Sequence, residues 1–302
     1  MKGIKSFDVI IIGGSYAGLS AAMALGRSLR DVLIIDSGLP CNRQTPHSHN
    51  FITQDGETPA TIAAKARAQV MAYDTVQFIS DLAISGKKSE NVFTISTQRN
   101  GDFISKKLIF ATGIKDILPD VKGLAECWGI SVIHCPYCHG YEFRHHNTGI
   151  MANGEKAFHL ASLIHNLTDK LTILTSGEAD FSSEQMAKLS KHNILVMPSE
   201  IAEITHDAGQ IRQVIFKDGN KADFKALYAA VPFIQHSEIP VTLGCALTEH
   251  GYIKVDELQR TTVEGVFACG DNSSPMRSVA NAVYRGNLTG AIVNKALVDE
   301  QF

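Results

Sequence analysis

The N-terminal region carries the feature that most limits the fold: a strand, a glycine-rich turn and a helix, followed by a second strand. The apolar run Phe7–Ile12 has the length of a buried strand, and Gly13-Gly14-Ser15-Tyr16-Ala17-Gly18 follows it directly. A helical stretch to about Leu29 leads into a second apolar run, Val32–Ile35, which ends at Asp36. This order predicts a βαβ unit whose helix N-terminus can bind a phosphate group.

The glycine loop departs from the GxGxxG pattern, because Ser15 stands at the position of the second glycine. A serine still lets the backbone approach a pyrophosphate, and Gly13 and Gly18 keep the other two positions. Asp36, at the end of the second strand, is placed to accept hydrogen bonds from a ribose hydroxyl. A plain strand–helix turn with a solvated aspartate is the alternative, but the flanking strands and helix favour a dinucleotide site.

The same order of elements recurs in the middle of the chain. A strand over Thr148–Ala152, a helix over about 155–167 and a strand over Leu171–Leu174 form a second βαβ unit. The C-terminal part, with strand Gly265–Cys269 and a helix over about 277–298, returns to the first unit. The predicted fold class is α/β, with two Rossmann-like (FAD/NAD(P)-binding) domains, the second inserted in the first, each with a β-meander. The expected boundaries are 1–117 and 240–302 for the FAD-binding domain and 118–239 for the inserted domain.

Two cysteines lie mid-chain in the string Cys135-Pro136-Tyr137-Cys138. Cysteines at this spacing can close a small, reducible disulfide, and a helix N-terminus would lower the pKa of the thiols. The thiolate is the species that attacks a disulfide or a flavin. Beside a dinucleotide fold, the pair predicts an enzyme that moves two electrons between a flavin and a thiol.

Zinc and haem are the alternative partners for the two cysteines. A structural zinc site needs four convergent ligands, and the flanking His134 and His139 cannot readily surround one ion. The string up to His139 also fits c-type haem attachment, which requires export, and the N-terminus shows no signal-peptide pattern. No metal is therefore expected. His139 is expected either to hold or shuttle a thiol proton or to be an exposed loop histidine.

Composition and charge argue against several classes of function. The chain has 302 residues, of which 44% are hydrophobic and 20% charged, as in soluble globular proteins. A formal charge of −3 argues against nucleic-acid binding. The sequence contains no apolar run of 18 residues, so no membrane span is expected. Without a signal-peptide pattern the expected location is cytoplasmic, where the four remaining cysteines are expected to be free thiols.

The second glycine loop is altered. It reads Gly149-Ile150-Met151-Ala152-Asn153-Gly154, with Met151 where a close-approach glycine is expected to leave room for a pyrophosphate. The next strand leads into Thr175–Asp180, which holds two acidic residues and no Arg or Lys. Because the 2′-phosphate of NADP needs a cation, NADPH use is doubtful. The inserted domain is expected to have lost, or greatly weakened, pyridine-nucleotide binding.

Together these features resemble the low-molecular-weight thioredoxin reductase family of FAD-dependent pyridine nucleotide-disulfide oxidoreductases. The resemblance covers nearly the whole chain: the N-terminal loop, Ala111-Thr112-Gly113, the CxxC, the inserted domain, and Gly270-Asp271 ahead of a helix. Within the family, the string CPYCHGYE resembles a branch that includes the gliotoxin- and holomycin-type dithiol oxidases.

The resemblance implies FAD in the first domain, a homodimer, and unequal roles for the two cysteines. Cys138 would face flavin C4a, and Cys135 would exchange with the substrate. His139 stands where thioredoxin reductases have an aspartate, and together with the altered second loop it favours flavin–dithiol chemistry over NADPH use. The residues implied to contact FAD are Gly13, Ser15, Gly18, Asp36, Thr112, Gly270, Asp271, Arg277, Ser278 and Val279.

The expected function is that of an FAD-dependent thiol–disulfide oxidoreductase with a Cys135–Cys138 redox disulfide. The favoured direction is dithiol oxidation, with electrons passing through the flavin to oxygen or another acceptor. A thioredoxin-disulfide reductase using NADPH or another donor such as ferredoxin is the alternative, and a non-catalytic flavin-binding module is a third. The expected partner is a dithiol or disulfide substrate, either a small molecule or a thioredoxin-like protein, with no nucleic acid and no membrane.

Overall fold

The computed structural model describes residues 4–90 and 92–302, which form two compact units. Unit 1 comprises the described residues up to Arg43, Glu57–Lys115 and Ile234–Phe302, and unit 2 comprises Gln44–Gly56 and Asp116–Phe233. The expected α/β architecture, with one domain inserted in another, is therefore present.

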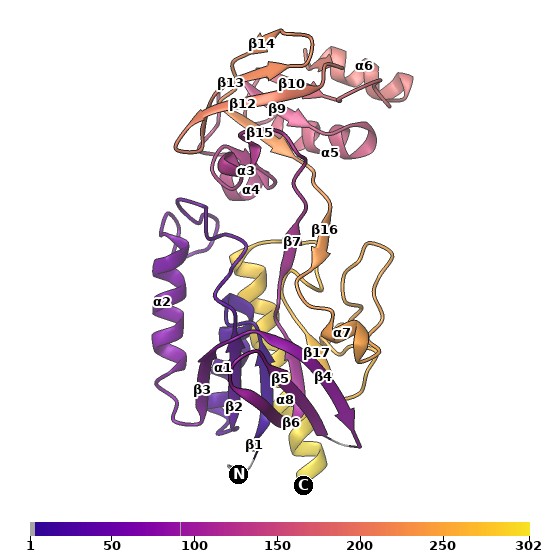
Figure 1. The fold of residues 1–302 in the computed structure, drawn as a ribbon. Coiled ribbons are helices and arrows are strands. Elements are labelled where there is room, and N and C mark those ends of the chain that lie inside the picture. The colour runs from indigo at the N-terminus through magenta and orange to yellow at the C-terminus, as the bar shows by residue number, and fades with distance from the viewer. Residues whose placement is uncertain (1–3, 91) are drawn as a thin grey trace. The chain divides into compact units, whose positions relative to one another are not determined.

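The junctions between the units lie at 115/116 and 233/234, whereas 117/118 and 239/240 were expected. Both fall inside short strands, β7 (Ile114–Asp116) and β16 (Phe233–Gln235), which pair with each other (Figure 1). A second difference is that residues 44–56 group with unit 2. This segment packs locally on unit 2, where a Cβ atom on Gly129 would lie 3.2 Å from Thr45 Oγ1.

Unit 1 is built on a seven-stranded sheet with the order β3-β2-β1-β6-β5-β4, in which β17 also pairs with β6. Strands β1, β2, β3, β6 and β17 run parallel, whereas β4, β5 and β6 form an antiparallel meander. The first half of β6 pairs with β5 and its last residues pair with β17. The bounds are β1 Lys5–Ile12, β2 Val32–Asp36, β3 Val76–Ser80, β4 Ala83–Ser89, β5 Val92–Thr97, β6 Gly101–Phe110 and β17 Val266–Ala268.

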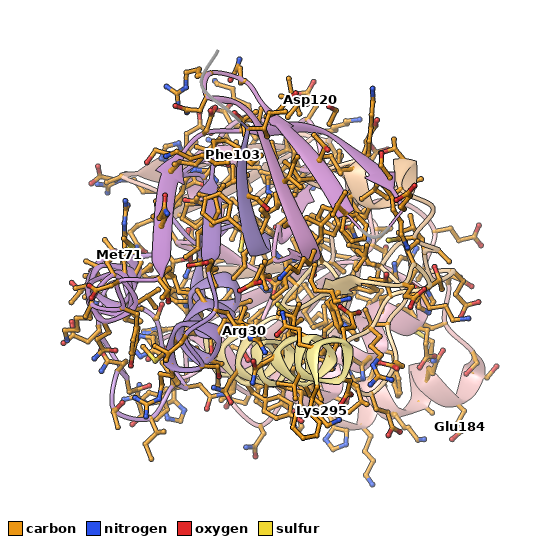
Figure 2. The ribbon with its side chains drawn as sticks, turned by 90° about the horizontal axis from the view of Figure 1, so that it is seen from below. Arg30, Met71, Phe103, Asp120, Glu184 and Lys295 are labelled. Carbon is orange, nitrogen blue, oxygen red and sulfur yellow. A yellow bond between two sulfur atoms is a disulfide. The ribbon has the colours of Figure 1, made fainter. Side chains whose placement is uncertain are left out.

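Helices α1 (Tyr16–Arg27) and α8 (Val279–Gln301) lie side by side in unit 1. A Cβ atom on Gly286 would lie 2.1 Å from the carbonyl oxygen of Ala17, so only glycine permits this close approach. Figure 2 shows Arg30, just beyond α1, against the last helix, where it donates a 2.7 Å hydrogen bond to an asparagine side chain. The C-terminal helix therefore packs on the N-terminal βαβ unit, as predicted. The other helices of unit 1 are α2 Pro59–Val70 and α7 Ile239–Thr242.

Unit 2 contains a five-stranded parallel sheet with the order β11-β10-β9-β15-β8 and a three-stranded antiparallel sheet, β12-β13-β14. The strand bounds are β8 Val132–Ile133, β9 Thr148–Met151, β10 Leu171–Leu174, β11 Leu195–Met197, β12 Ile201–Asp207, β13 Gln210–Phe216, β14 Lys221–Ala222 and β15 Ala226–Ala229. The helix bounds are α3 Leu124–Cys127, α4 Pro136–His139, α5 Gly154–Ile164 and α6 Ser183–Lys191. Across the described residues of both units, no helix is long and apolar enough to cross a membrane.

Candidate active site

The loop between β1 and α1 is tightly packed around its glycines. Gly13 has a φ of +106°, and a Cβ atom there would lie 2.2 Å from the carbonyl oxygen of Ala111. A Cβ atom on Gly18 would lie 1.9 Å from the carbonyl oxygen of Gly13. Ser15 is the N-cap of α1, and its backbone is extended. The predicted glycines therefore bring the loop, the end of β6 and the first turn of α1 together, with the unpaired N–H groups of a helix N-terminus.

Asp36, the last residue of β2, holds this loop in place through hydrogen bonds. Its Oδ1 accepts the backbone N–H of Gly14 at 2.8 Å, and its Oδ2 accepts that of Gly38 at 3.1 Å. Each carboxylate oxygen can accept more than one hydrogen bond, so the side chain can still accept from a ribose hydroxyl. The sequence predicted the ribose contact but not the bond to the loop.

The residues after β17 meet the N-terminus of α1. Gly270 has a φ of +87°, and a Cβ atom there would lie 3.1 Å from the Cβ atom of Ala17. Asp271 Oδ2 lies 3.7 Å from Nε of Arg277, and the two side chains are only 16% and 15% exposed. Ser278 caps α8 by accepting the backbone N–H of Asn281 at 3.1 Å, and Val279 begins the helix. Unit 1 thus holds all ten residues expected to contact FAD.

Asn272 belongs to the same cluster and was not singled out in the sequence. Its Nδ2 donates to the carbonyl oxygen of Phe110 at 2.8 Å and to Thr112 Oγ1 at 3.3 Å. The backbone carbonyl oxygen of Asn272 accepts a hydrogen bond from Nε2 of Gln235 at 2.9 Å. The side-chain oxygens of Asn272 and Gln235 are both buried without a hydrogen-bond partner among the described residues. Two buried acceptors of this kind fit a bound group with hydroxyl and N–H donors, as FAD has.

Cys135 and Cys138 form a disulfide in unit 2, with their Cα atoms 5.3 Å apart. Cys135 is the N-cap of α4, and Pro136 occupies the first helical position, where a missing N–H is not needed. The N–H groups of Cys138 and His139 both donate to the carbonyl oxygen of Cys135 at 3.3 Å. Because α4 is a single turn, its dipole contributes less to thiolate stability than the sequence suggested.

His139 is half-buried rather than an exposed loop residue. Burial lowers its pKa from the ordinary histidine value, Glu142 acts in the opposite direction, and His49 lowers the pKa further. A lowered pKa keeps the imidazole neutral at neutral pH, so one ring nitrogen can accept a proton. This is the state that a group receiving a thiol proton needs.

The turn of α4 packs closely on β15, through residues that the sequence analysis did not single out. A Cβ atom on Gly140 would lie 2.4 Å from Leu167 Cδ1 and 3.0 Å from the hydroxyl oxygen of Tyr228. Tyr228 is buried, and burial together with the charge of Glu142 raises its pKa. A glycine just after the CxxC motif was the only local signal for this packing.

The loop between β9 and α5 is filled by side chains of the protein itself. Asn153 Oδ1 accepts the backbone N–H groups of Gly154 at 2.8 Å and Asp180 at 2.9 Å, and its Nδ2 donates to the carbonyl oxygen of Glu178 at 2.8 Å. A Cβ atom on Gly154 would lie 3.2 Å from Oδ2 of Asp180. The carboxamide of Asn153 and the carboxylate of Asp180 therefore lie against the first turn of α5.

Met151 does not obstruct this loop in the expected way. It is the last residue of β9, and its side chain packs against the core that includes Trp128, Leu174 and Leu227. The expectation that Met151 would crowd a pyrophosphate was wrong, because its side chain is directed to the core. The side chains that lie against this loop are instead those of Asn153 and Asp180.

The remaining cysteines and histidines show no metal centre. Within the described residues, no three His, Cys, Asp or Glu side chains are arranged to hold a metal ion. His134 stacks on Trp128, with ring centroids 6.0 Å apart. The other four cysteines form no disulfide within the described residues; Cys41 is exposed, and Cys127, Cys245 and Cys269 are buried.

Comparison with known proteins agrees with these features. The family model described as pyridine nucleotide-disulphide oxidoreductase matches residues 7–286. Thioredoxin reductase tcpT of Claviceps purpurea is 31% identical over 302 residues, which cover 96% of this chain and 94% of that protein. Thioredoxin reductase sirT of Leptosphaeria maculans is 30% identical over 305 residues, which cover 95% and 93%.

Two solved structures share the fold over nearly the whole chain. HlmI superposes with a TM-score of 0.93 at 27% identity, covering 99% of this chain and 96% of that one. An oxidoreductase from Agrobacterium tumefaciens gives a TM-score of 0.91 at 36% identity, covering 97% and 99%. These matches confirm the family resemblance and the two-domain fold class expected from the motifs. The chain therefore belongs to the pyridine nucleotide-disulphide oxidoreductase family and is a thioredoxin reductase-like disulfide oxidoreductase, a membership that implies FAD as its cofactor.

Proposed function

We propose that the enzyme oxidises dithiols through the Cys135–Cys138 disulfide and FAD, with oxygen or another acceptor taking the electrons. The observation that carries this direction is the filled loop between β9 and α5. In a nucleotide-binding domain the first N–H groups of this helix face a pyrophosphate. Here Asn153 already accepts the N–H of Gly154, and the carboxylate of Asp180 lies against the same turn.

The energetic consequence is weak binding of a pyridine nucleotide. Losing a charge-assisted phosphate contact costs roughly 1.5–3 kcal/mol, or about one to two orders of magnitude in affinity. The pyrophosphate contact is obstructed, and Thr175–Asp180 supplies no cation for a 2′-phosphate. A dithiol reaches the disulfide without needing either contact, which favours it as the electron source.

The proposed reaction begins at Cys135. A substrate thiol gives its proton to a ring nitrogen of neutral His139 as its sulfur attacks Cys135 Sγ. The bond to Cys138 breaks, Cys138 leaves as a thiolate, and Cys135 forms a mixed disulfide with the substrate. The second substrate thiol then attacks the substrate sulfur of the mixed disulfide and gives its proton to Cys135, which leaves as a thiol, so the substrate becomes a disulfide. Two electrons have then moved from the substrate to the cysteine pair.

FAD, when bound, would supply the two-electron redox chemistry that reoxidises the cysteine pair and delivers the electrons to an acceptor. In unit 1 the loop from Gly13 to Gly18 and the N-terminus of α1 would hold its pyrophosphate. Asp36 would hold the adenosine ribose, and Asp271 the ribityl–phosphate part. Thr112 and the first residues of α8, from Arg277 to Val279, would line the flavin side. Asn272 joins this set because its buried side-chain oxygen needs a donor.

A thioredoxin-disulfide reductase is the second candidate, favoured by the similarity to the fungal thioredoxin reductases tcpT and sirT. In that case NADPH or another donor such as ferredoxin would reduce the flavin, and the cysteine pair would pass electrons to a protein disulfide. The substrate in either direction is a small dithiol or a thioredoxin-like protein. A homodimer and a cytoplasmic location belong to the same proposal; light scattering and cell fractionation test them.

Steady-state assays separate the two candidates. Purified enzyme with FAD should consume oxygen when given dithiothreitol, and Cys135→Ser and Cys138→Ser should each abolish that consumption. Cys245→Ser is the control, because this thiol lies in the core of unit 1. Rapid NADPH-dependent reduction of a thioredoxin, with no oxygen consumption from dithiols, would reverse the order of the candidates.

A further inference from the structure

Residues 44–56, which we call the strap, belong to unit 2, although the chain on either side of them belongs to unit 1. The strap is closed on itself, since Gly56 N donates to the carbonyl oxygen of Ser48 at 2.9 Å. His47 Nδ1 also makes a 2.8 Å hydrogen bond with the carbonyl oxygen of Gly56. A compact loop packed by its own residues holds its side chains in defined places.

One of these side chains, His49, lies between two carboxylates. Its Nε2 is 3.6 Å from Glu142 Oε1, and its Nδ1 is 3.8 Å from Asp55 Oδ2. The other oxygen of Asp55 accepts the backbone N–H of Asn50 at 2.7 Å, which fixes that carboxylate within the strap. An imidazole with a carboxylate facing each ring nitrogen has a set orientation and can donate to both only when protonated.

Glu142 connects His49 to α4, the helix that carries the cysteine pair. It follows His139, the last residue of α4, by three positions, and both Glu142 and His49 change the pKa of His139. Burial is the largest effect and lowers that pKa, Glu142 raises it, and His49 lowers it. Tyr228 also interacts with Glu142: burial and the Glu142 charge raise the pKa of Tyr228, which keeps its hydroxyl protonated. The Cys135–Cys138 disulfide adjoins His139, and the His47 ring lies 6.4 Å from that of His49.

We propose that Glu142 and His49 are positioning residues that stabilise the proton taken up by His139 and pass it toward solvent. This proposal rests on the proposed dithiol oxidation. The substrate S–H gives its proton to His139 as its sulfur attacks Cys135, and the electron pair of the broken disulfide leaves on Cys138. The positive charge on His139 is then balanced by Glu142. His49 is 22% exposed and in contact with Glu142, so it offers the next proton position before water.

Two variants test the arrangement, Glu142→Gln and His49→Gln. Each should slow the reduction of the cysteine disulfide by dithiothreitol by roughly 10-fold, less than the hundredfold or more expected when a proton-transfer group is removed. The midpoint of the pH dependence of disulfide reduction, which His139 sets, should move in opposite directions in the two variants. Removing the Glu142 charge lowers the pKa of His139, whereas removing the His49 charge raises it.

The matched control is His47→Gln, a change in the same strap that leaves both carboxylates facing His49. It should keep the wild-type rate and midpoint. The midpoint is read from acid-quenched thiol counts and, independently of any flavin, from the NMR titration of His139 in labelled protein. Midpoints that stay at the wild-type value, that move the same way in both variants, or that are reproduced by His47→Gln would overturn the proposal.

Assays on the wild-type protein distinguish a failure of this proposal from a failure of the proposed dithiol oxidation. If dithiothreitol fails to reduce the wild-type disulfide while NADPH reduces the flavin, the proposed direction is wrong. The NMR titration of His139 still decides the positioning role in that case. Opposite shifts in the two variants support it, and equal or absent shifts contradict it.

Discussion

Asn153 accepts the backbone N–H of Asp180 at 2.9 Å, and this bond ties the loop after β9 to the segment after β10. The same side-chain oxygen accepts the N–H of Gly154, the first residue of α5. The N–H of Gly154, which in a dinucleotide domain would be offered to a pyrophosphate, is therefore already paired with a side chain of the protein. Unit 2 keeps the nucleotide-binding fold and uses the loop for its own stability.

Replacing this side chain should destabilise unit 2. Asn153→Ala removes a helix N-cap and the bond to Asp180, and N-cap losses typically cost about 1 kcal/mol. Urea unfolding followed by circular dichroism measures the difference. Ser199→Ala, which removes an exposed bond to Asp218, is the control and should stay within about 0.5 kcal/mol of the wild type. An Asn153→Ala protein as stable as the control would show that the loop is not held in this way.

Flavin retention should depend on Asp271. Loss of a charge-assisted hydrogen bond weakens binding by roughly 1.5–3 kcal/mol, so Asp271→Ala should raise the dissociation constant for FAD about 10- to 100-fold. The ratio of flavin to protein after gel filtration, and the affinity of the apoprotein for FAD, measure this. Asp299→Ala, on the exposed part of α8, should retain the wild-type ratio. Equal flavin content in the two variants would remove Asp271 from the cofactor site.

The two cysteines should give different spectra. If Cys138 is the residue next to the flavin, Cys135→Ser leaves a thiolate there and should show a long-wavelength charge-transfer band. Cys138→Ser should show none. Anaerobic absorption spectra of the two variants provide the measurement, and a band in Cys138→Ser alone would exchange the assigned roles.

His139 should set the acidic limb of the pH–rate profile of dithiol-driven reduction. Its pKa is lowered chiefly by burial, so the rate of dithiol-driven reduction should fall only below the ordinary histidine range. His139→Gln should slow that reduction by about 10²- to 10⁴-fold and remove the limb. Stopped-flow rates across pH test this, and a variant with the wild-type profile would return His139 to a structural role.

The same pKa has a consequence for stability, with a definite sign. Because the folded-state pKa is below the unfolded value, the unfolded chain binds more protons in the interval between the two. The contribution of His139 is therefore present above the unfolded pKa and is lost as pH falls through the folded one. His139→Gln should lose less stability than the wild type between neutral and mildly acidic pH, as measured by urea unfolding.

Elements set by local periodicity could be predicted, whereas contacts between distant segments could not. The strand Leu171–Leu174 has the predicted bounds, and the loops at Gly13 and Gly270 lie where their glycines indicated. Met151 was misjudged because a sequence does not show which face of a strand end turns to the core. The position of the strap in unit 2 was not predicted, because it involves a contact between His49 and Glu142, which are far apart in the sequence.

The most direct test of the account is an anaerobic stopped-flow comparison of dithiothreitol, NADPH and NADH as reductants of the enzyme-bound flavin. We expect rapid bleaching by dithiothreitol that requires both Cys135 and Cys138. We expect slow bleaching by NADPH and NADH, without saturation at micromolar concentrations. Rapid, saturable bleaching by micromolar NADPH would contradict it and would make the protein a thioredoxin reductase in function as well as in fold.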